Sequence, residues 1–170
     1  MRSVAGSRAA AAASAGLLLA AAACTPPSVA PADTPRGLTA GDYAQALFDG
    51  TNAVRAEQDL PPFEEDECAR AQALDRAEAL VGAAELEHAP LEPVVEACDP
   101  ANVAAENLSR SATAPADVLE AWWESPGHRS NIVDPELGQL GVACAPTDEG
   151  EMLCSQIFLG VVGDEAPTQG

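Results

Sequence analysis

Four cysteines constrain the fold of this chain more than any other feature. Cys68, Cys98, Cys144 and Cys154 follow a fifth cysteine, Cys24. An even number in an exported domain indicates disulfides, and four cysteines allow three pairings. Neighbours in sequence are favoured, which predicts Cys68–Cys98 and Cys144–Cys154, and each bridge stabilises the fold by roughly 2–4 kcal/mol. A zinc site built from cysteines is the competing interpretation, which the lack of C-x-x-C spacing disfavours.

The N-terminal residues 1–23 are typical of a signal peptide. Arg2 and Arg8 supply positive charge, and residues 9–23 are an uncharged run rich in Ala and Leu. This run is shorter than the roughly 20 apolar residues that cross a bilayer. The sequence therefore predicts export, which also supports the disulfide interpretation.

Cys24 directly follows Ala21-Ala22-Ala23, an arrangement that resembles a bacterial lipoprotein signal. In such signals the cysteine becomes the lipidated first residue of the mature chain. Ordinary cleavage after an A-x-A site is the alternative, and it leaves Cys24 as a free thiol, a liability in an oxidising compartment. We therefore expect the membrane as a partner through lipid on Cys24, and a location on the outer face of the bacterial cell membrane.

The rest of the chain divides into three segments. Residues 24–37 are Pro-rich and are predicted to form an extended linker. Residues 38–163 are long enough for one hydrophobic core and too short for two ordinary domains. Residues 164–170 are expected to be a disordered tail.

The charge of the chain is strongly negative. All 27 Asp and Glu residues follow Cys24, together with six Arg and no Lys, so the mature chain carries about −21. Such a surface repels nucleic acid and anionic lipid headgroups, so we expect no nucleic-acid partner. We also expect a monomer. A salty habitat or a GC-rich genome explains the acidity as well as a function does.

Hydrophobic spacing predicts three helices. The first covers residues 40–58 and begins with a cap at Thr39. The second covers residues 65–84. The third begins near residue 113, with a proline in its first turn, and ends at residues 125–127. The buried face of the second helix is predicted to carry Cys68, Ala71, Leu74 and Val81.

Two strands are predicted at the end of the domain. Residues 141–145 and 152–159 are rich in strand-forming side chains and flank a polar turn. An antiparallel pairing of the two strands places Cys144 opposite Cys154. Helices first and strands last indicate an α+β domain with its elements in layers.

The chain contains two histidines, His88 and His128, and both are expected in irregular segments beyond helices, where binding residues collect. Glu106 lies between them in an otherwise apolar and small context. By themselves, two histidines are more often surface residues than a site.

The order of the segments resembles the CAP superfamily of cysteine-rich secretory, antigen 5 and pathogenesis-related proteins, in its short bacterial branch (SCP-like domains). The resemblance covers about residues 43–160. The tryptophan-to-asparagine segment is the most distinctive of the matching pieces. These pieces are residues 52–55 (NAVR), 60–63 (LPPF), His88, residues 105–108 (AENL), 121–132 (AWWESPGHRSNI), 140–142 (LGV) and 156–160 (QIFLG).

The resemblance implies an α-β-α sandwich with a small antiparallel sheet between helical layers, and a cleft where two His and two Glu converge. Carried over by position, three of these are His88, Glu106 and His128. The slot of the second Glu is occupied by Ser125, and Glu124 lies one residue earlier, which turns a helical side chain by roughly 100°. One further residue, Gln156, either faces this cleft or hydrogen-bonds within the sheet.

The predicted cleft residues suit a divalent cation, zinc or magnesium. His88 and His128 are the expected metal ligands, and Glu106 either completes the set or polarises a bound water. Without metal, the same three side chains form a hydrogen-bonded network that braces the loops. The sequence leaves both interpretations open.

Three functions follow from these expectations. The favoured one is an extracellular, lipid-anchored domain that binds a small molecule, a lipid such as a sterol, or a cell-envelope component, without catalysis. The alternative is a metal-assisted hydrolase of peptides, esters or glycans, with Glu106 as base and the two histidines as ligands. Against it, the chain lacks the H-E-x-x-H and G-x-S-x-G patterns. The third is a structural envelope protein with a vestigial cleft.

Overall fold

The computed structural model describes residues 37–163 of the chain. The predictions for Cys24, the signal peptide, residues 24–36 of the linker and the tail 164–170 lie outside this range. Within it, no helix is long and apolar enough to cross a membrane. The elements are α1 (Ala40–Glu57), β1 (Glu64–Glu65), α2 (Glu67–Leu80), α3 (Glu92–Ala97), β2 (Val103–Ser111), α4 (Pro115–Glu124), α5 (Pro126–Val133), β3 (Gln139–Pro146) and β4 (Met152–Gly160).

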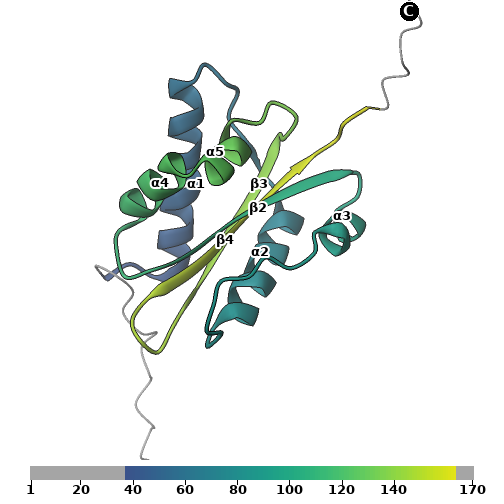
Figure 1. Ribbon diagram of the computed structural model, residues 1–170. Helices are drawn as coiled ribbons and strands as arrows, with labels where there is room; N and C mark the ends of the chain where they lie inside the picture. Colours follow the sequence, from purple (N-terminus) through teal and green to yellow (C-terminus); the bar gives the residue numbers. More distant parts are fainter. Residues whose placement is uncertain (1–36, 164–170) are drawn as a thin grey trace, which may run out of the picture.

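The sheet lies between two helical layers (Figure 1). α1, α4 and α5 cover one face, and α2 and α3 cover the other. The strand order is β1-β3-β4-β2, with β4 antiparallel to both β2 and β3. The predicted α+β class, the layers and the C-terminal hairpin are therefore confirmed.

One edge of the sheet departs from the expected antiparallel arrangement. Glu64 and Glu65 of β1 pair parallel with β3, so the sheet is mixed. The reason is the route of the chain. After α1 the chain passes along β3 for two residues and then enters α2, which Asp66 caps.

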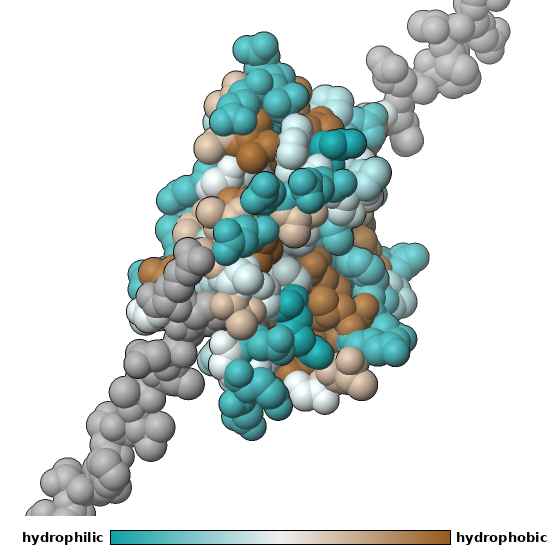
Figure 2. All heavy atoms as spheres, turned by 60° about the vertical axis from the view of Figure 1, so that its left-hand side comes forward, coloured by the Kyte–Doolittle hydropathy of each residue, from teal (hydrophilic) through white to brown (hydrophobic). Residues whose placement is uncertain are grey.

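The larger hydrophobic core lies under α1, α4 and α5. Thr39 accepts a hydrogen bond from the backbone N–H of Asp42, which confirms the predicted start of α1. Tyr43 of α1 and Trp122 of α4 are buried in one cluster with Phe158 of β4. The outer surface of this face is mostly hydrophilic, with apolar side chains exposed in patches between polar ones (Figure 2).

The buried face of α2 differs from the predicted one. Leu74 and Val81 are 36% and 42% exposed, whereas the side chains that pack on the sheet are alanines. The cause is a close approach between α2 and β3: a Cβ atom on Gly141 would lie 2.0 Å from the backbone nitrogen of Arg70. At that separation, only small side chains fit between the helix and the sheet. The residues that fill this space are Ala69, Ala73 and Ala77.

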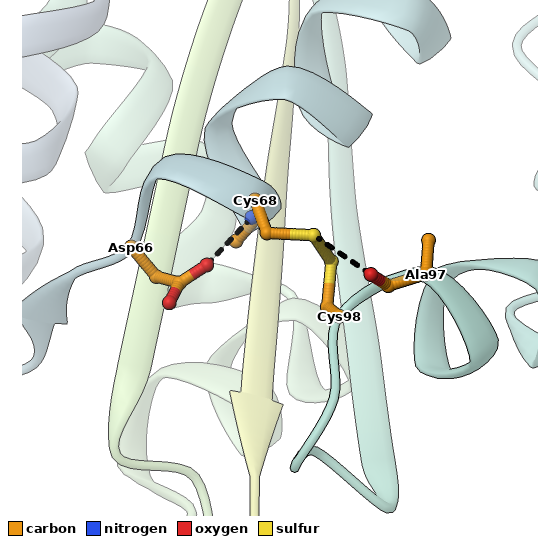
Figure 3. Close-up of a disulfide and its surroundings, with 5 residues drawn as sticks. Asp66, Cys68, Ala97 and Cys98 are labelled. Carbon is orange, nitrogen blue, oxygen red and sulfur yellow. Dashed lines mark hydrogen bonds between the residues drawn. A yellow bond between two sulfur atoms is a disulfide. The ribbon is translucent and has the colours of Figure 1, made fainter.

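Both predicted disulfides are present. Cys68–Cys98 joins the first turn of α2 to the residue that follows α3, with 5.7 Å between the Cα atoms (Figure 3). Asp66 caps α2 beside this bridge by accepting a hydrogen bond from the N–H of Ala69. Cys144–Cys154 links directly opposed residues of β3 and β4. The first bridge therefore ties the α2–α3 layer together, and the second closes the hairpin.

The structure also contains four elements that the sequence analysis did not predict: β1, β2, α3 and α5. Ser125 ends α4 as predicted, but Pro126 occupies the first turn of a new helix, α5. Proline is tolerated there because the first N–H groups of a helix have no partner within it. His128 therefore lies in the first turn of α5, which corrects the expectation that it lies in an irregular segment.

Candidate ligand-binding cleft

The centre of the site is the carboxylate of Glu106, which β2 directs toward α2. Its side chain is 1% exposed. One oxygen, Oε1, accepts a hydrogen bond from Ser155 Oγ at 3.1 Å and lies 3.8 Å from Arg76 Nε. The other oxygen, Oε2, lies 2.8 Å from His88 Nδ1. Both oxygens therefore have partners, which is what a buried carboxylate requires.

His88 connects this buried carboxylate to solvent. It lies in the irregular segment between α2 and α3, as predicted, and its side chain is 55% exposed. Because the carboxylate of Glu106 accepts, Nδ1 of His88 is the donor, and Nε2 is left for another partner. A carboxylate that fixes an imidazole in this way orients the ring toward a ligand.

His128 approaches the site from the opposite helical layer. Burial lowers the pKa of its imidazole, and the charge of His88 lowers that pKa further. His128 is accordingly neutral at neutral pH. Its backbone oxygen accepts a hydrogen bond at 3.3 Å from Asn107, the residue after Glu106 on β2, so His128 and Glu106 lie at the same part of that strand. Its ring lies 6.5 Å from that of Trp122, centroid to centroid.

A cavity of about 500 Å³ lies beside His128, between the edge of β2 and α4. This volume falls in the range of roughly 300–1,000 Å³ that is usual for small-molecule sites. Two buried polar atoms among its lining residues, Ser109 Oγ and Arg110 Nε, have no hydrogen-bond partner within residues 37–163. The apolar lining side chains are Leu86, Leu108, Val118, Ala121 and Trp122.

Three further residues of the predicted cleft have different positions. Ser125 lines the cavity, whereas Glu124 is exposed at the end of α4 and does not line it. Gln156 is fully buried on the sheet face under α1, where it donates to Thr51 Oγ1 at 2.8 Å and accepts from Asn107 at 3.1 Å. Gln156 therefore takes the second of its two expected roles, a hydrogen bond in the interior.

Two asparagines that sequence reasoning missed hold the site together. Asn131 of α5 donates to the side-chain oxygen of Asn107 at 2.9 Å and to the backbone oxygen of Glu106 at 3.2 Å. Asn107 in turn donates to the backbone oxygen of His128 at 3.3 Å. These bonds attach the first turn of α5 to β2. The only sequence feature that points to these asparagines is their position: Asn107 directly follows Glu106, and Asn131 lies three residues after His128.

The donor set for a metal is small. Among the residues that the structure describes, no three His, Cys, Asp or Glu side chains form a group that could hold a metal ion. A catalytic zinc ion usually has three protein ligands, and the carboxylate of Glu106 is hydrogen-bonded to Ser155 and His88. The geometry favours Glu106 as the group that orients His88. Metal binding stays a prediction, and a zinc-dependent rise in melting temperature that His88→Ala removes would support it.

Comparison with known proteins identifies the fold and the family. The chain is 27% identical to YkwD of Bacillus subtilis over 124 residues, which is 69% of this chain and 47% of YkwD, so it spans about half of that relative. An outer surface protein of Borrelia burgdorferi has a TM-score of 0.67 at 17% identity, over 74% of this chain and 97% of that one. An extracellular protein of Bacillus anthracis with an SCP domain has a TM-score of 0.62 at 21% identity, over 75% and 43%.

The family model covers most of the globular part. The model for the CAP, or cysteine-rich secretory protein, family matches residues 48–159, a range that begins in α1 and ends in β4. It includes both disulfides and all three predicted cleft residues. The chain therefore belongs to the cysteine-rich secretory protein (CAP) family.

Proposed function

We propose that this protein is an extracellular binding domain that holds a small amphipathic molecule in the cavity between β2 and α4. The observation that carries the proposal is the cavity itself, about 500 Å³ in volume, whose apolar walls are joined by the polar side chains of Ser125 and His128. A ligand with an apolar body and one polar end would cover these apolar walls and hydrogen-bond to the polar side chains of the lining.

His128 is part of the cavity lining, and His88, which is outside that lining, is hydrogen-bonded to Glu106 of β2. Nε2 of His88 is free to hydrogen-bond a ligand, and the neutral ring of His128 offers a donor or an acceptor. Glu106 is buried and hydrogen-bonded to Ser155 and His88, an arrangement that orients an imidazole, and the apolar walls of the cavity support binding better than hydrolysis.

The proposed location rests on three observations. Two disulfides join the four cysteines of the domain, as expected in an oxidising compartment. The two structural neighbours described above are an extracellular protein and an outer surface protein. The sequence around Cys24 is typical of a bacterial lipoprotein. We therefore propose that the domain lies outside the cell and is held to the membrane by lipid on Cys24, and mass spectrometry of the mature protein tests the anchor.

Titration with an environment-sensitive fluorescent fatty acid and a fluorescent sterol tests the binding function. Ala121→Trp fills the cavity from α4 and should abolish saturable binding. Ala116→Trp is the matched control, because Ala116 is also exposed on α4 but does not line the cavity. The proposal fails if neither probe binds saturably, or if the two variants lose affinity equally.

A further inference from the structure

One edge of the sheet is covered by helices, whereas most of the other edge has no strand beside it within residues 37–163. At the β2 edge, the backbone oxygens of Glu106 and Leu108 accept hydrogen bonds from Asn131 Nδ2 and Trp122 Nε1. α4 and α5 therefore close that edge. At the other edge, β1 pairs with the first two residues of β3 and then turns away. The remaining outer edge of β3 has no strand beside it within residues 37–163.

The backbone groups along this edge can be assigned from the pairing. The N–H of Glu64 donates to Gly138 O, and the N–H of Asp66 donates to Leu140 O, so even-numbered residues of β3 direct their backbone groups away from β4. The alternation of the ladder turns Val142 and Cys144 the same way. Both residues are 6% exposed. Because no strand of residues 37–163 pairs with these groups, this edge of β3 is available to an added strand.

The space beside these groups is a groove and not a packed surface. A cavity of about 330 Å³ lies along residues 142–144 of β3, between α1 and α2. Its polar and charged lining residues are Gln45, Glu65 and Arg70. Pro146, which has no N–H, ends β3 and limits the length of any added strand. The apolar walls are Ala44 and Phe48 on α1 and Leu74 on α2.

We propose that this groove binds a short, extended, basic peptide that pairs with Val142 and Cys144 as an added strand and continues the line of β1. Charge complementarity selects the occupant. Arg70, the cation among the lining residues, is held by Glu67 at 2.7 Å, and Glu65 carries the opposite charge. A further carboxylate, that of Asp49, is held by Gln45 at 2.9 Å. A second copy of the full chain would bring a further net charge of −19, so an acidic self-pairing is disfavoured.

Pairing as an added strand requires every second backbone N–H of the peptide to hydrogen-bond to β3. Main-chain pairing supplies the affinity, and alternate side chains enter the groove. Alternate backbone nitrogens of the peptide face the protein, and the others face solvent. Methyl groups on one set should therefore abolish binding, whereas methyl groups on the other set should not.

The experiment uses a fluorescein-labelled heptapeptide of alternating lysine and valine and two analogues, methylated on the valine or on the lysine nitrogens. The analogues have the same charge and similar composition. We expect saturable binding that weakens with salt, an affinity difference between the analogues of at least ~10-fold, and slowed amide exchange of Val142 and Cys144 in NMR spectra of the ¹⁵N-labelled protein. Equal affinity of the two analogues, or unchanged exchange at both amides, overturns the proposal.

Two substitutions locate the site. Leu74→Arg places bulk and positive charge on the rim of the groove and should weaken binding of the peptide by at least ~10-fold. Val81→Arg is the matched control, since Val81 is also exposed near the end of α2 but does not line the groove. Equal weakening by both substitutions, or an occupant that proves to be a second copy in sedimentation, also overturns the proposal.

Discussion

Gly141 of β3 allows α2 to pack directly on the sheet, and replacing it with alanine tests how much of the fold depends on that approach. The added Cβ would lie 2.0 Å from Arg70 N, 2.2 Å from Ala69 C and 2.6 Å from Arg70 Cα. All three atoms belong to the backbone of α2, so a change of side-chain rotamer gives no relief. Ordinary contact begins at 3.4 Å, and α2 must therefore withdraw by about 1.4 Å.

The loss of stability can be estimated from the contacts that α2 loses when it moves away from the sheet. Overpacking usually costs about 1–3 kcal/mol when the neighbours adjust. Here a whole helix must move, and its buried alanines lose contact with the sheet. We expect Gly141→Ala to lower the free energy of unfolding by about 3 kcal/mol or more, which corresponds to a fall in melting temperature of roughly 10 °C for a domain of this size.

Thermal and urea unfolding, followed by circular dichroism with the disulfides intact, measure the effect. Gly138→Ala is the control, because no atom lies within 4 Å of a Cβ at that position and Gly138 immediately precedes the same strand. It should change stability by no more than about 0.5 kcal/mol. If the two variants unfold at the same temperature, the close approach of α2 to β3 is not a constraint, and our account of the alanine face is wrong.

Three other predictions concern the site and the disulfides. Folding lowers the pKa of His128, so the unfolded state takes up the proton first as the pH drops. The free energy of unfolding should therefore fall below about pH 6.5, the unperturbed pKa of histidine. Between pH 7.5 and pH 5.5, the melting temperature should fall less for His128→Asn than for the unsubstituted protein. Glu106→Gln should cost about 1–3 kcal/mol by weakening the pairing with His88 and Arg76, whereas the exposed control Glu124→Gln should change urea unfolding little. Removing Cys68–Cys98, with a separation of 30 residues, should cost about 1 kcal/mol more than removing Cys144–Cys154, with a separation of 10; equal losses in urea unfolding would contradict the loop-entropy account.

Local patterns predicted the parts of the fold that depend on nearby residues. The cap at Thr39 and the polar turn between β3 and β4 each act over a few positions, and both pairs of cysteines are neighbours in sequence. The buried face of α2 was mispredicted because Gly141, about seventy residues later, decides it. Hydrophobicity alone favours Leu74 over Ala73, but the close approach of the backbones admits only the smaller side chain.

The sequence predicted which residues form the candidate site but not how they are arranged in space. The family resemblance singled out His88, Glu106 and His128, but their geometry arises from three different elements. β2 escaped prediction because its centre carries Glu106 and Asn107, which are buried on opposite faces and paired there by other side chains. The cavity needs α4 beside the edge of β2, and no local sequence pattern encodes that contact.

The close approach at Gly141 and the polar site depend on each other through α2. Gly141 sets the height of the helix above the sheet, and Arg76, two turns further along α2, lies 3.8 Å from the carboxylate of Glu106. Arg76 also donates to the backbone oxygen of Pro90, two residues after His88, and so ties the loop of His88 to the helix. A shift of α2 therefore moves the cation and the imidazole together, while Glu106 stays on β2. Because hydrogen bonds weaken over a few tenths of an ångström, we expect a shift of α2 away from Gly141 to weaken the hydrogen bond between His88 and Glu106 as well.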